Sequence, residues 1–193
     1  MSDSNKTKQK IISPIVNYSE RLLKKASQIK LVITDVDGVL SDGKVFYSNQ
    51  GEELKNFNIK DGLGIKQLLD NNVQVAIITG RQSDIVERRA KELGITFIYQ
   101  GKSNKIKSYL SIIEQMNINQ SQVAHIGDDL PDLPLMQQSG LGICVADGHF
   151  FVQENADWIT QNIGGNGAVR EVSDLILQSQ NKLQIIHNKY LNQ

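Results

Sequence analysis

The sequence has little cysteine, no excess of charge of either sign and no long apolar run. Its one cysteine, Cys144, cannot form a disulfide within the chain. It lies in the apolar run 141–146, which predicts a small, buried side chain rather than a reactive one. A chain of this kind suits a reducing compartment, and we expect a cytoplasmic protein.

The balance of charge and the shortness of the apolar runs exclude two classes of partner. Lysine and arginine together number 21, as do aspartate and glutamate, so no overall field favours nucleic acid or an anionic membrane. The first residues, MSDSNKTKQK, lead into no apolar stretch of signal-peptide length, and no later run approaches the ~20 apolar residues of a membrane span. We expect no nucleic-acid partner, no membrane partner and no export.

The length and composition are those of one globular domain. The chain has 193 residues, of which 39% are hydrophobic and 22% charged, and this is enough for one sizeable core. We predict a flexible N-terminal tail over residues 1–18, a folded domain over 19–179 and a C-terminal tail over 180–193.

Short apolar runs alternate with amphipathic segments, which is the pattern of a parallel sheet covered by helices. It predicts an α/β fold with a Rossmann-like parallel sheet. The predicted strands are 31–35, 73–79, 95–99, 123–127 and 141–145, and the predicted helices are 20–29, 62–71, 83–93, 104–116 and 131–138. Residues 44–57, around Asn49-Gln50-Gly51, predict a β-hairpin inserted after the first strand.

Two carboxylates follow the first predicted strand, in the sequence LVITDVDGVL at residues 31–40. Asp35 and Asp37 stand beside Gly38, where the chain can turn sharply and bring both to one point. One can act as a nucleophile that forms an aspartyl-phosphate, and the other as its acid/base partner. An Asp-x-Asp-Gly sequence is also common in turns and calcium loops, but the buried strand before it favours a reactive site.

Candidate anion contacts follow the second strand and begin a later helix. In AIITGR, Thr79 and Gly80 can present a hydroxyl and a backbone N–H to a phosphate oxygen, and Arg81 adds a bidentate cation. Lys105 lies near a helix N-terminus that itself favours anions. Each of these features alone is ordinary, since a strand-to-helix turn and a solvated surface lysine look the same in a sequence.

An acidic cluster follows the strand at 123–127, in the text VAHIGDDLPDL. It contains Asp128, Asp129 and Asp132, and three carboxylates within five residues are costly to gather without a cation. Magnesium prefers hard oxygen ligands. We predict that Asp128 completes a magnesium site begun by Asp35.

Taken together, these four motifs resemble the haloacid-dehalogenase superfamily, whose DxDG, Thr or Ser, Lys and GDD-type motifs occur here in the same order. The resemblance covers residues 31–175. It implies that Asp35 is nucleophile and metal ligand, and that Asp37 is general acid/base and a ligand through its backbone carbonyl. It further implies that Asp128 is the third protein ligand and that Thr79 and Lys105 hold the phosphoryl group.

Longer stretches resemble one family within that superfamily, the 3-deoxy-D-manno-octulosonate (Kdo) 8-phosphate phosphatases. These stretches are 35–66, AIITGR, GDDLPDLPLM and GGNGAVREVSDLIL. The resemblance implies a capless magnesium phosphatase of lipopolysaccharide biosynthesis that forms a homotetramer with active sites shared between subunits. The residues it implies at the substrate are Asp37, Asn58, Ile59, Lys60, Asp61, Gly62, Lys66, Gly80, Arg81, Arg89 and Lys105. Asn166 departs from the basic residue expected between those glycines.

Three other readings stay open. A receiver domain uses similar residues, but there the acidic pair precedes the phosphorylated aspartate, whereas here the acidic cluster comes last. A non-catalytic phosphatase-like oligomerisation domain keeps the fold, yet all the acidic motifs are intact here. A phosphatase for another sugar-acid phosphate, of nine carbons, shares the hairpin and the motifs.

Overall fold

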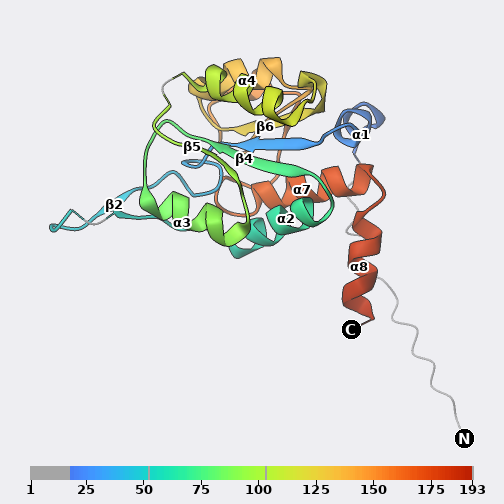
Figure 1. Ribbon diagram of the computed structural model, residues 1–193, viewed down its shortest axis with the longest axis horizontal. Coiled ribbons are helices and arrows are strands. Elements are labelled where there is room, and N and C mark those ends of the chain that lie inside the picture. Colours follow the sequence, from blue (N-terminus) through green and yellow to red (C-terminus); the bar gives the residue numbers. More distant parts are fainter. Residues whose placement is uncertain (1–17, 52, 103, 193) are drawn as a thin grey trace, which may run out of the picture.

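A parallel sheet of six strands forms the centre of the molecule (Figure 1). The computed structural model describes residues 18–51, 53–102 and 104–192, so the predicted tail at 1–18 lies outside them except for Tyr18. The sheet order is β5-β4-β1-β6-β7-β8. The strands are β1 (Leu31–Thr34), β4 (Gln74–Ile78), β5 (Phe97–Tyr99), β6 (Val123–Gly127), β7 (Leu141–Cys144) and β8 (Trp158–Ile159). The predicted α/β fold is confirmed.

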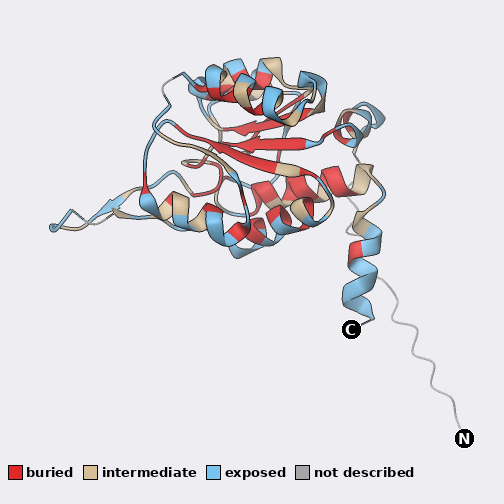
Figure 2. Cartoon of the chain, in the orientation of Figure 1, coloured by how far each residue is buried: buried red, intermediate tan, exposed pale blue. Residues whose placement is uncertain are grey.

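Helices cover both faces of the sheet because successive strand side chains point to opposite sides. Leu31 and Ile33 pack with Tyr109 on one face, whereas Val32 belongs to the larger core on the other. The first face is covered by α4 (Lys105–Met116) and α5 (Leu133–Gln138), and the second by α1 (Glu20–Ser27), α2 (Ile59–Asp70), α3 (Asp84–Leu93) and α7 (Ala168–Ser179). Figure 2 shows the resulting buried strands between the half-buried helices.

Smaller elements connect these layers. Two short 3₁₀ helices, η1 (Gln120–Gln122) and η2 (Leu130–Asp132), flank β6, and α6 (Phe150–Glu154) places Val152 against buried Cys144. The hairpin strands β2 (Phe46–Tyr47) and β3 (Glu53–Leu54) pair antiparallel and project from the body of the molecule (Figure 1). The described residues contain no helix long and apolar enough to cross a membrane.

Most predicted boundaries shift by one or two residues, and two larger differences concern helices. Helix α2 begins at Ile59 rather than at Gly62, because the Asn58 side chain accepts a hydrogen bond from the Lys60 N–H at 2.8 Å and caps the helix earlier. Residues 180–193 were expected to be a tail, but they include helix α8 (Leu183–Leu191), whose Ile186 is buried against the core. The remaining surface of α8 is mostly exposed (Figure 2).

Candidate active site

The predicted catalytic side chains meet at the carboxyl ends of three neighbouring strands, where open α/β sheets bind their ligands. Asp35 follows β1, Thr79 follows β4 and Asp128 follows β6, and β1 lies between the other two strands. An open pocket lies among them. The residues that line it are Asp35, Asp37, Thr79, Gly80, Arg81, Lys105, Asp128, Asp129, Pro131 and Asp132.

Three of the carboxylates form a compact cluster. Ligand atoms of Asp35, Asp128 and Asp132 all lie within 4.8 Å of one another. Oδ1 of Asp35 is buried and has no hydrogen-bond partner among the described residues, and an unsatisfied buried carboxylate oxygen is costly. Hard oxygen donors at this spacing fit a magnesium ion. Asp35 and Asp128 are the predicted ligands, and the structure adds Asp132 beside them.

Lys105 is the cation that the protein itself supplies to this cluster. It is the first residue of α4 and almost fully buried, and its Nζ lies 3.0 Å from Oδ2 of Asp35 and 2.8 Å from Oδ1 of Asp132. Oδ1 of Asp132 also lies 3.2 Å from Nε2 of fully buried His125, and its Oδ2 accepts a hydrogen bond from the Asp128 N–H. Asp132 thereby holds Lys105 beside Asp35.

Burial and crowded negative charge shift the proton affinities of these groups. Burial, followed by the charges of Asp132 and Asp35, raises the pKa of Asp128 to about 7. Burial and the charge of Asp132 also raise the pKa of Asp35. Burial alone would lower the pKa of Lys105, but the charges of Asp132 and Asp35 outweigh it and raise that pKa. The cluster therefore holds more negative charge than Lys105 can balance, which favours binding of a cation.

Asp37 faces a second set of charged groups, contributed by the hairpin and by the loop after β4. Lys55 Nζ makes a short contact with Oδ1 of Asp37 and lies 3.3 Å from Oε1 of Glu53. Arg81 Nε lies 3.7 Å from Oδ2 of Asp37, and Arg81 Nη2 hydrogen-bonds the Tyr47 hydroxyl at 2.8 Å. The sequence analysis did not predict that Lys55, Glu53 and Tyr47 lie at this site. The available signal was the alternation of charged and apolar residues at Glu53, Leu54 and Lys55.

Thr79 and Gly80 lie on the other side of the pocket. Thr79 is 3% exposed, and its N–H donates to the Tyr99 carbonyl at 2.9 Å, which fixes the end of β4 beside β5. Gly80 is exposed, and a β-carbon built on it would meet nothing within 4 Å. The backbone at Gly80 is thus open to a ligand, as a phosphoryl contact would require.

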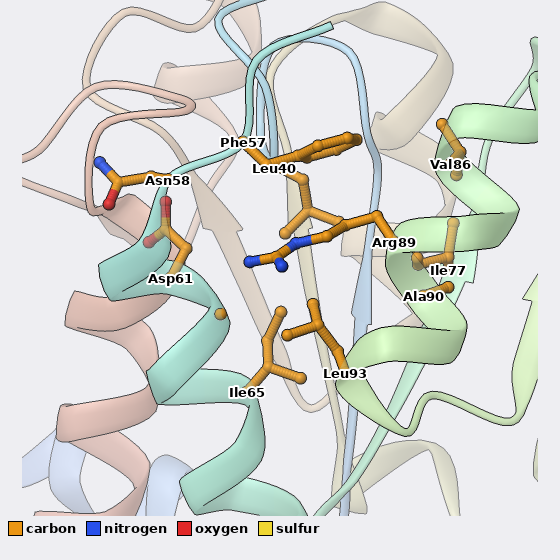
Figure 3. Close-up of a pocket in the computed structure, with 11 residues that line it drawn as sticks. Leu40, Phe57, Asn58, Asp61, Ile65, Ile77, Val86, Arg89, Ala90 and Leu93 are labelled. Carbon is orange, nitrogen blue, oxygen red and sulfur yellow. The ribbon is translucent and has the colours of Figure 1, made fainter.

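The predicted substrate segment 58–62 lies at the start of α2, beside a second, narrow pocket. Arg89 extends from α3 across this pocket beneath Phe57, towards Asn58 and Asp61 (Figure 3). The free volume of about 10 Å³ is room for about one water molecule, so a sugar acid does not fit in this conformation. Ile59, Lys60 and Lys66 lie exposed on α2, outside the pocket's lining.

Asp61 has both carboxylate oxygens occupied within the protein. It is 1% exposed, and it accepts hydrogen bonds from the N–H groups of Gly167 at 3.1 Å and Arg170 at 2.7 Å. These are orphan donors at the N-terminus of α7, so Asp61 caps that helix from α2. A contact between Asp61 and the substrate, as predicted, would have to compete with these two hydrogen bonds.

The glycine-rich loop before α7 lies against the loop that carries the paired aspartates. The Gly165 N–H donates to the Val39 carbonyl at 2.8 Å, and a β-carbon on Gly164 would lie 1.8 Å from the Gly38 carbonyl oxygen. Asn166, at the position where a basic residue was expected, is exposed. The glycines therefore allow a close backbone contact that supports the loop of Asp35 and Asp37.

Comparison with known proteins places this geometry in a family. The 3-deoxy-D-manno-octulosonate 8-phosphate phosphatase of Salmonella typhi is 50% identical over 165 residues, which are 86% of this chain and 88% of that protein. The chain belongs to the family of 3-deoxy-D-manno-octulosonate 8-phosphate phosphatases. A family model described as haloacid dehalogenase-like hydrolase also matches residues 94–172. The chain is therefore a phosphoric monoester hydrolase.

Solved structures of this phosphatase family share the fold. The enzyme of Yersinia pestis superposes with a TM-score of 0.85 at 49% identity and covers 86% of this chain and 89% of its own. The enzyme of Moraxella catarrhalis, solved in complex with a magnesium ion, a phosphate ion and a KDO molecule, has a TM-score of 0.88 at 44% identity and covers 90% of this chain and 99% of its own. The predicted resemblance is thus confirmed at the level of the family.

Proposed function

We propose that this chain hydrolyses Kdo 8-phosphate to Kdo and inorganic phosphate through an aspartyl-phosphate on Asp35. The observation that carries the proposal is the arrangement of Asp35 between the buried cation Lys105 and the carboxylate of Asp128. The family membership supplies the substrate class, since the Moraxella catarrhalis relative holds magnesium, phosphate and KDO.

In this mechanism a carboxylate oxygen of Asp35 attacks phosphorus, and the bond between phosphorus and the sugar oxygen breaks. Asp37 gives its proton to that sugar oxygen, which leaves as the alcohol. Water then attacks the phosphorus of the aspartyl-phosphate while Asp37 takes up the water's proton. Inorganic phosphate leaves, and the Asp35 carboxylate is restored.

The other residues bind and neutralise the transferring group. Lys105 Nζ, 3.0 Å from Asp35, faces the place where a phosphoryl group would lie, with Thr79 and the open backbone of Gly80 opposite. We assign Asp35, Asp128 and the Asp37 backbone carbonyl as the ligands of Mg²⁺. When bound, Mg²⁺ supplies charge neutralisation for the carboxylates and the phosphoryl oxygens.

The sugar acid needs cover and a partner for its carboxylate. Arg81 is half-exposed and lines the open pocket around Asp35, which we call the carboxylate pocket, and Arg89 lies in the narrow pocket beside α2. Small-molecule sites enclose most of their ligand, whereas the pocket around Asp35 is open and, among the residues that the structure describes, the hairpin is the insertion that lies beside it. We propose a homotetramer in which hairpins of neighbouring subunits close each active site.

The same proposal places the enzyme in the cytoplasm and in lipopolysaccharide biosynthesis. The residues predicted at the substrate, Asn58 to Gly62 with Lys66 and Arg89, remain assigned on the family resemblance. Asp61 is the exception within that set, because its contacts favour a helix-capping role.

The deciding experiment measures phosphate release with Mg²⁺ from Kdo 8-phosphate, sialic acid 9-phosphate and simple phosphate esters. We expect kcat/KM to be higher for Kdo 8-phosphate by about tenfold or more. Preference for the nine-carbon substrate would instead support the alternative phosphatase. No release from any ester would support the non-catalytic oligomerisation domain.

The Asp35→Asn variant tests the nucleophile. We expect it to keep its fold by circular dichroism and to lose turnover by about three orders of magnitude or more. Asp42→Asn, a partly buried acid of the same loop region that does not line the pocket around Asp35, is the matched control and is expected to keep most activity. Full activity of Asp35→Asn would contradict the aspartyl-phosphate mechanism.

A further inference from the structure

Strand β3 and Lys55, the residue that follows it, reach the active site of the same subunit. Side chains alternate along extended chain, and Glu53 and Lys55, whose charged groups lie 3.3 Å apart, face one way while Leu54 faces the other. Leu54 is 64% exposed, whereas the side chain of Lys55 has no exposed area. The hairpin therefore buries a lysine against the nucleophile loop, and the mechanism above assigns it no role.

A buried ammonium group must be paired, and Lys55 is paired with two carboxylates. Its Nζ makes a short contact with Oδ1 of Asp37 and lies 3.3 Å from Oε1 of Glu53. Glu53 Oε1 also lies 3.3 Å from Arg81 Nη2, so the cations Lys55 and Arg81 share the two carboxylates Glu53 and Asp37, and the four charges balance. Asp37 consequently receives a hydrogen-bond donor rather than an uncompensated cation, and the effect on Asp37 is chiefly one of orientation.

The two oxygens of Asp37 have different surroundings. Oδ1 is held by Lys55, while Oδ2 lies 3.7 Å from Arg81 Nε, beyond ordinary hydrogen-bond range. With Oδ1 fixed, the carboxyl plane is fixed, and Oδ2 is left available for a proton. Since Asp37 is 20% exposed and lines the carboxylate pocket, Oδ2 has access to the reacting group.

We propose that Lys55 is a positioning residue that holds Asp37 through Oδ1 and presents Oδ2 to the leaving oxygen. This inference rests on the proposed function, in which the proton of Asp37 passes to the sugar oxygen as the bond between phosphorus and oxygen breaks. Proton donation matters most for a poor leaving group such as the primary alcohol of a sugar. It matters little for 4-nitrophenolate, which leaves without a proton.

The test is the dependence of kcat/KM on the leaving group for the full-length protein with Mg²⁺, over a series of alkyl and substituted phenyl phosphates. The ratio kcat/KM reports on steps up to release of the alcohol and not on later hydrolysis of the intermediate. For Lys55→Met we expect kcat/KM to fall by about 10- to 100-fold on alkyl phosphates and by less than about threefold on 4-nitrophenyl phosphate. A plot of log(kcat/KM) against leaving-group pKa therefore becomes steeper.

Two further variants separate positioning from other effects. Lys55→Arg keeps a donor and a charge and is expected to restore part of the alkyl-ester activity. Lys44→Met removes an exposed lysine of the same loop, which pairs only weakly with Asp42 at 3.5 Å, and is expected to leave the slope unchanged. An equal loss on both ester classes in Lys55→Met would overturn the proposal and indicate phosphate binding or a folding defect.

Failure of the proposed function has a different signature. In that case the wild-type protein would release no phosphate from any ester, or Asp37→Asn would leave the leaving-group slope unchanged. If Asp37→Asn steepens the slope while Lys55→Met does not, then Asp37 donates the proton but Lys55 does not position it.

Discussion

Gly38 and Asp128 occupy adjoining space so closely that only glycine fits at position 38. A β-carbon built on Gly38 would lie 2.1 Å from Oδ2 of Asp128, and the backbone there has φ +94°. L-residues rarely adopt such a φ. The small residue after the paired aspartates thus allows the acidic loop after β6 to approach the loop of Asp35 and Asp37.

We therefore predict that Gly38→Ala weakens Mg²⁺ binding and activity. The new methyl group must displace the Asp128 carboxylate, and the backbone strain adds about 1–3 kcal/mol. Isothermal titration with Mg²⁺ and phosphate-release assays measure the two effects. Gly51→Ala is the control, because Gly51 has a similar φ of +82° but open space around it. Equal Mg²⁺ affinity in both variants would contradict the steric argument.

Residue types that end a strand or begin a helix were predictable, and their side-chain partners were not. The apolar runs before Asp35, Thr79 and Asp128 place each at one edge of a parallel sheet. By contrast, Asp132 contacts Lys105 across 27 positions of sequence and Lys55 contacts Asp37 across 18. Such pairs depend on how the loops fold back, and no local pattern specifies them.

At the scale of elements, α2 and α7 are joined by a carboxylate that serves as a remote cap. Burial raises the pKa of Asp61, and the backbone N–H groups of Arg170 and Gly167 act in the opposite direction. The family resemblance predicted Asp61 at the substrate. The start of α2 at Ile59 instead places Asp61 in the first helical turn, where it reaches the N-terminus of α7.

We predict that Asp61→Ala destabilises the protein by about 1–2 kcal/mol because two buried N–H groups lose their acceptor. The free energy of unfolding in urea measures the loss. Asp70→Ala, at the exposed end of the same helix, is the control and is expected to change little. If Asp61→Ala keeps its stability but shows a raised KM for the sugar-acid phosphate, the capping role is wrong and the substrate role is right.

The helix boundaries are explained by the residues that cap each helix, including the boundary that was predicted wrongly. Helix α3 ends at Leu93 with Gly94 in the left-handed conformation, as the sequence predicted. Helix α2 begins three residues before the predicted start, because Asn58 caps it and the prediction did not use that cap. Strands β2 and β3 have two residues each, fewer than the predicted hairpin at 44–57 suggested. A two-stranded ribbon that pairs with no further strand is only marginally stable, which keeps the strands short.

At the scale of the whole molecule, the projecting hairpin leaves apolar side chains without cover from the described chain. Phe46 is 56% exposed, Tyr47 66% and Leu54 64%. Apolar patches of this kind mark interaction surfaces. Within the proposed homotetramer, symmetry-related hairpins cover one another, since closed assemblies pair like surfaces.

We predict that replacing Phe46 and Tyr47 together with Asp yields monomers or dimers by light scattering. The same variant is expected to lose catalytic efficiency on Kdo 8-phosphate, because the neighbouring hairpin no longer covers the substrate. Tyr47→Phe is the control, since it removes only the hydroxyl that contacts Arg81 and keeps the apolar surface. A monomeric double variant with wild-type kcat/KM would refute the shared site.

The stability of the whole domain is also expected to depend on pH through the carboxylate cluster. The pKa of Asp128 is raised in the folded protein from 3.8 to about 7. A carboxyl group with a raised pKa in the folded state binds more protons there than in the unfolded chain. Without metal, its contribution is therefore full below about pH 4 and is lost as the pH rises towards 7.

Magnesium is expected to reverse this trend, because it binds the carboxylate form and must displace the proton of Asp128 below about pH 7. We predict that the increase in Tm on adding Mg²⁺ is small at about pH 5 and grows through about pH 7 to a plateau near pH 8. Differential scanning calorimetry with Mg²⁺ or with EDTA at each pH measures it. Asp128→Asn removes both the titrating group and a ligand, so its Tm should respond weakly to Mg²⁺ at every pH. An equal Mg²⁺ effect at about pH 5 and pH 8 in the wild-type protein would show that Asp128 does not control metal binding, and the ligand set would then have to rest on Asp35 and Asp132.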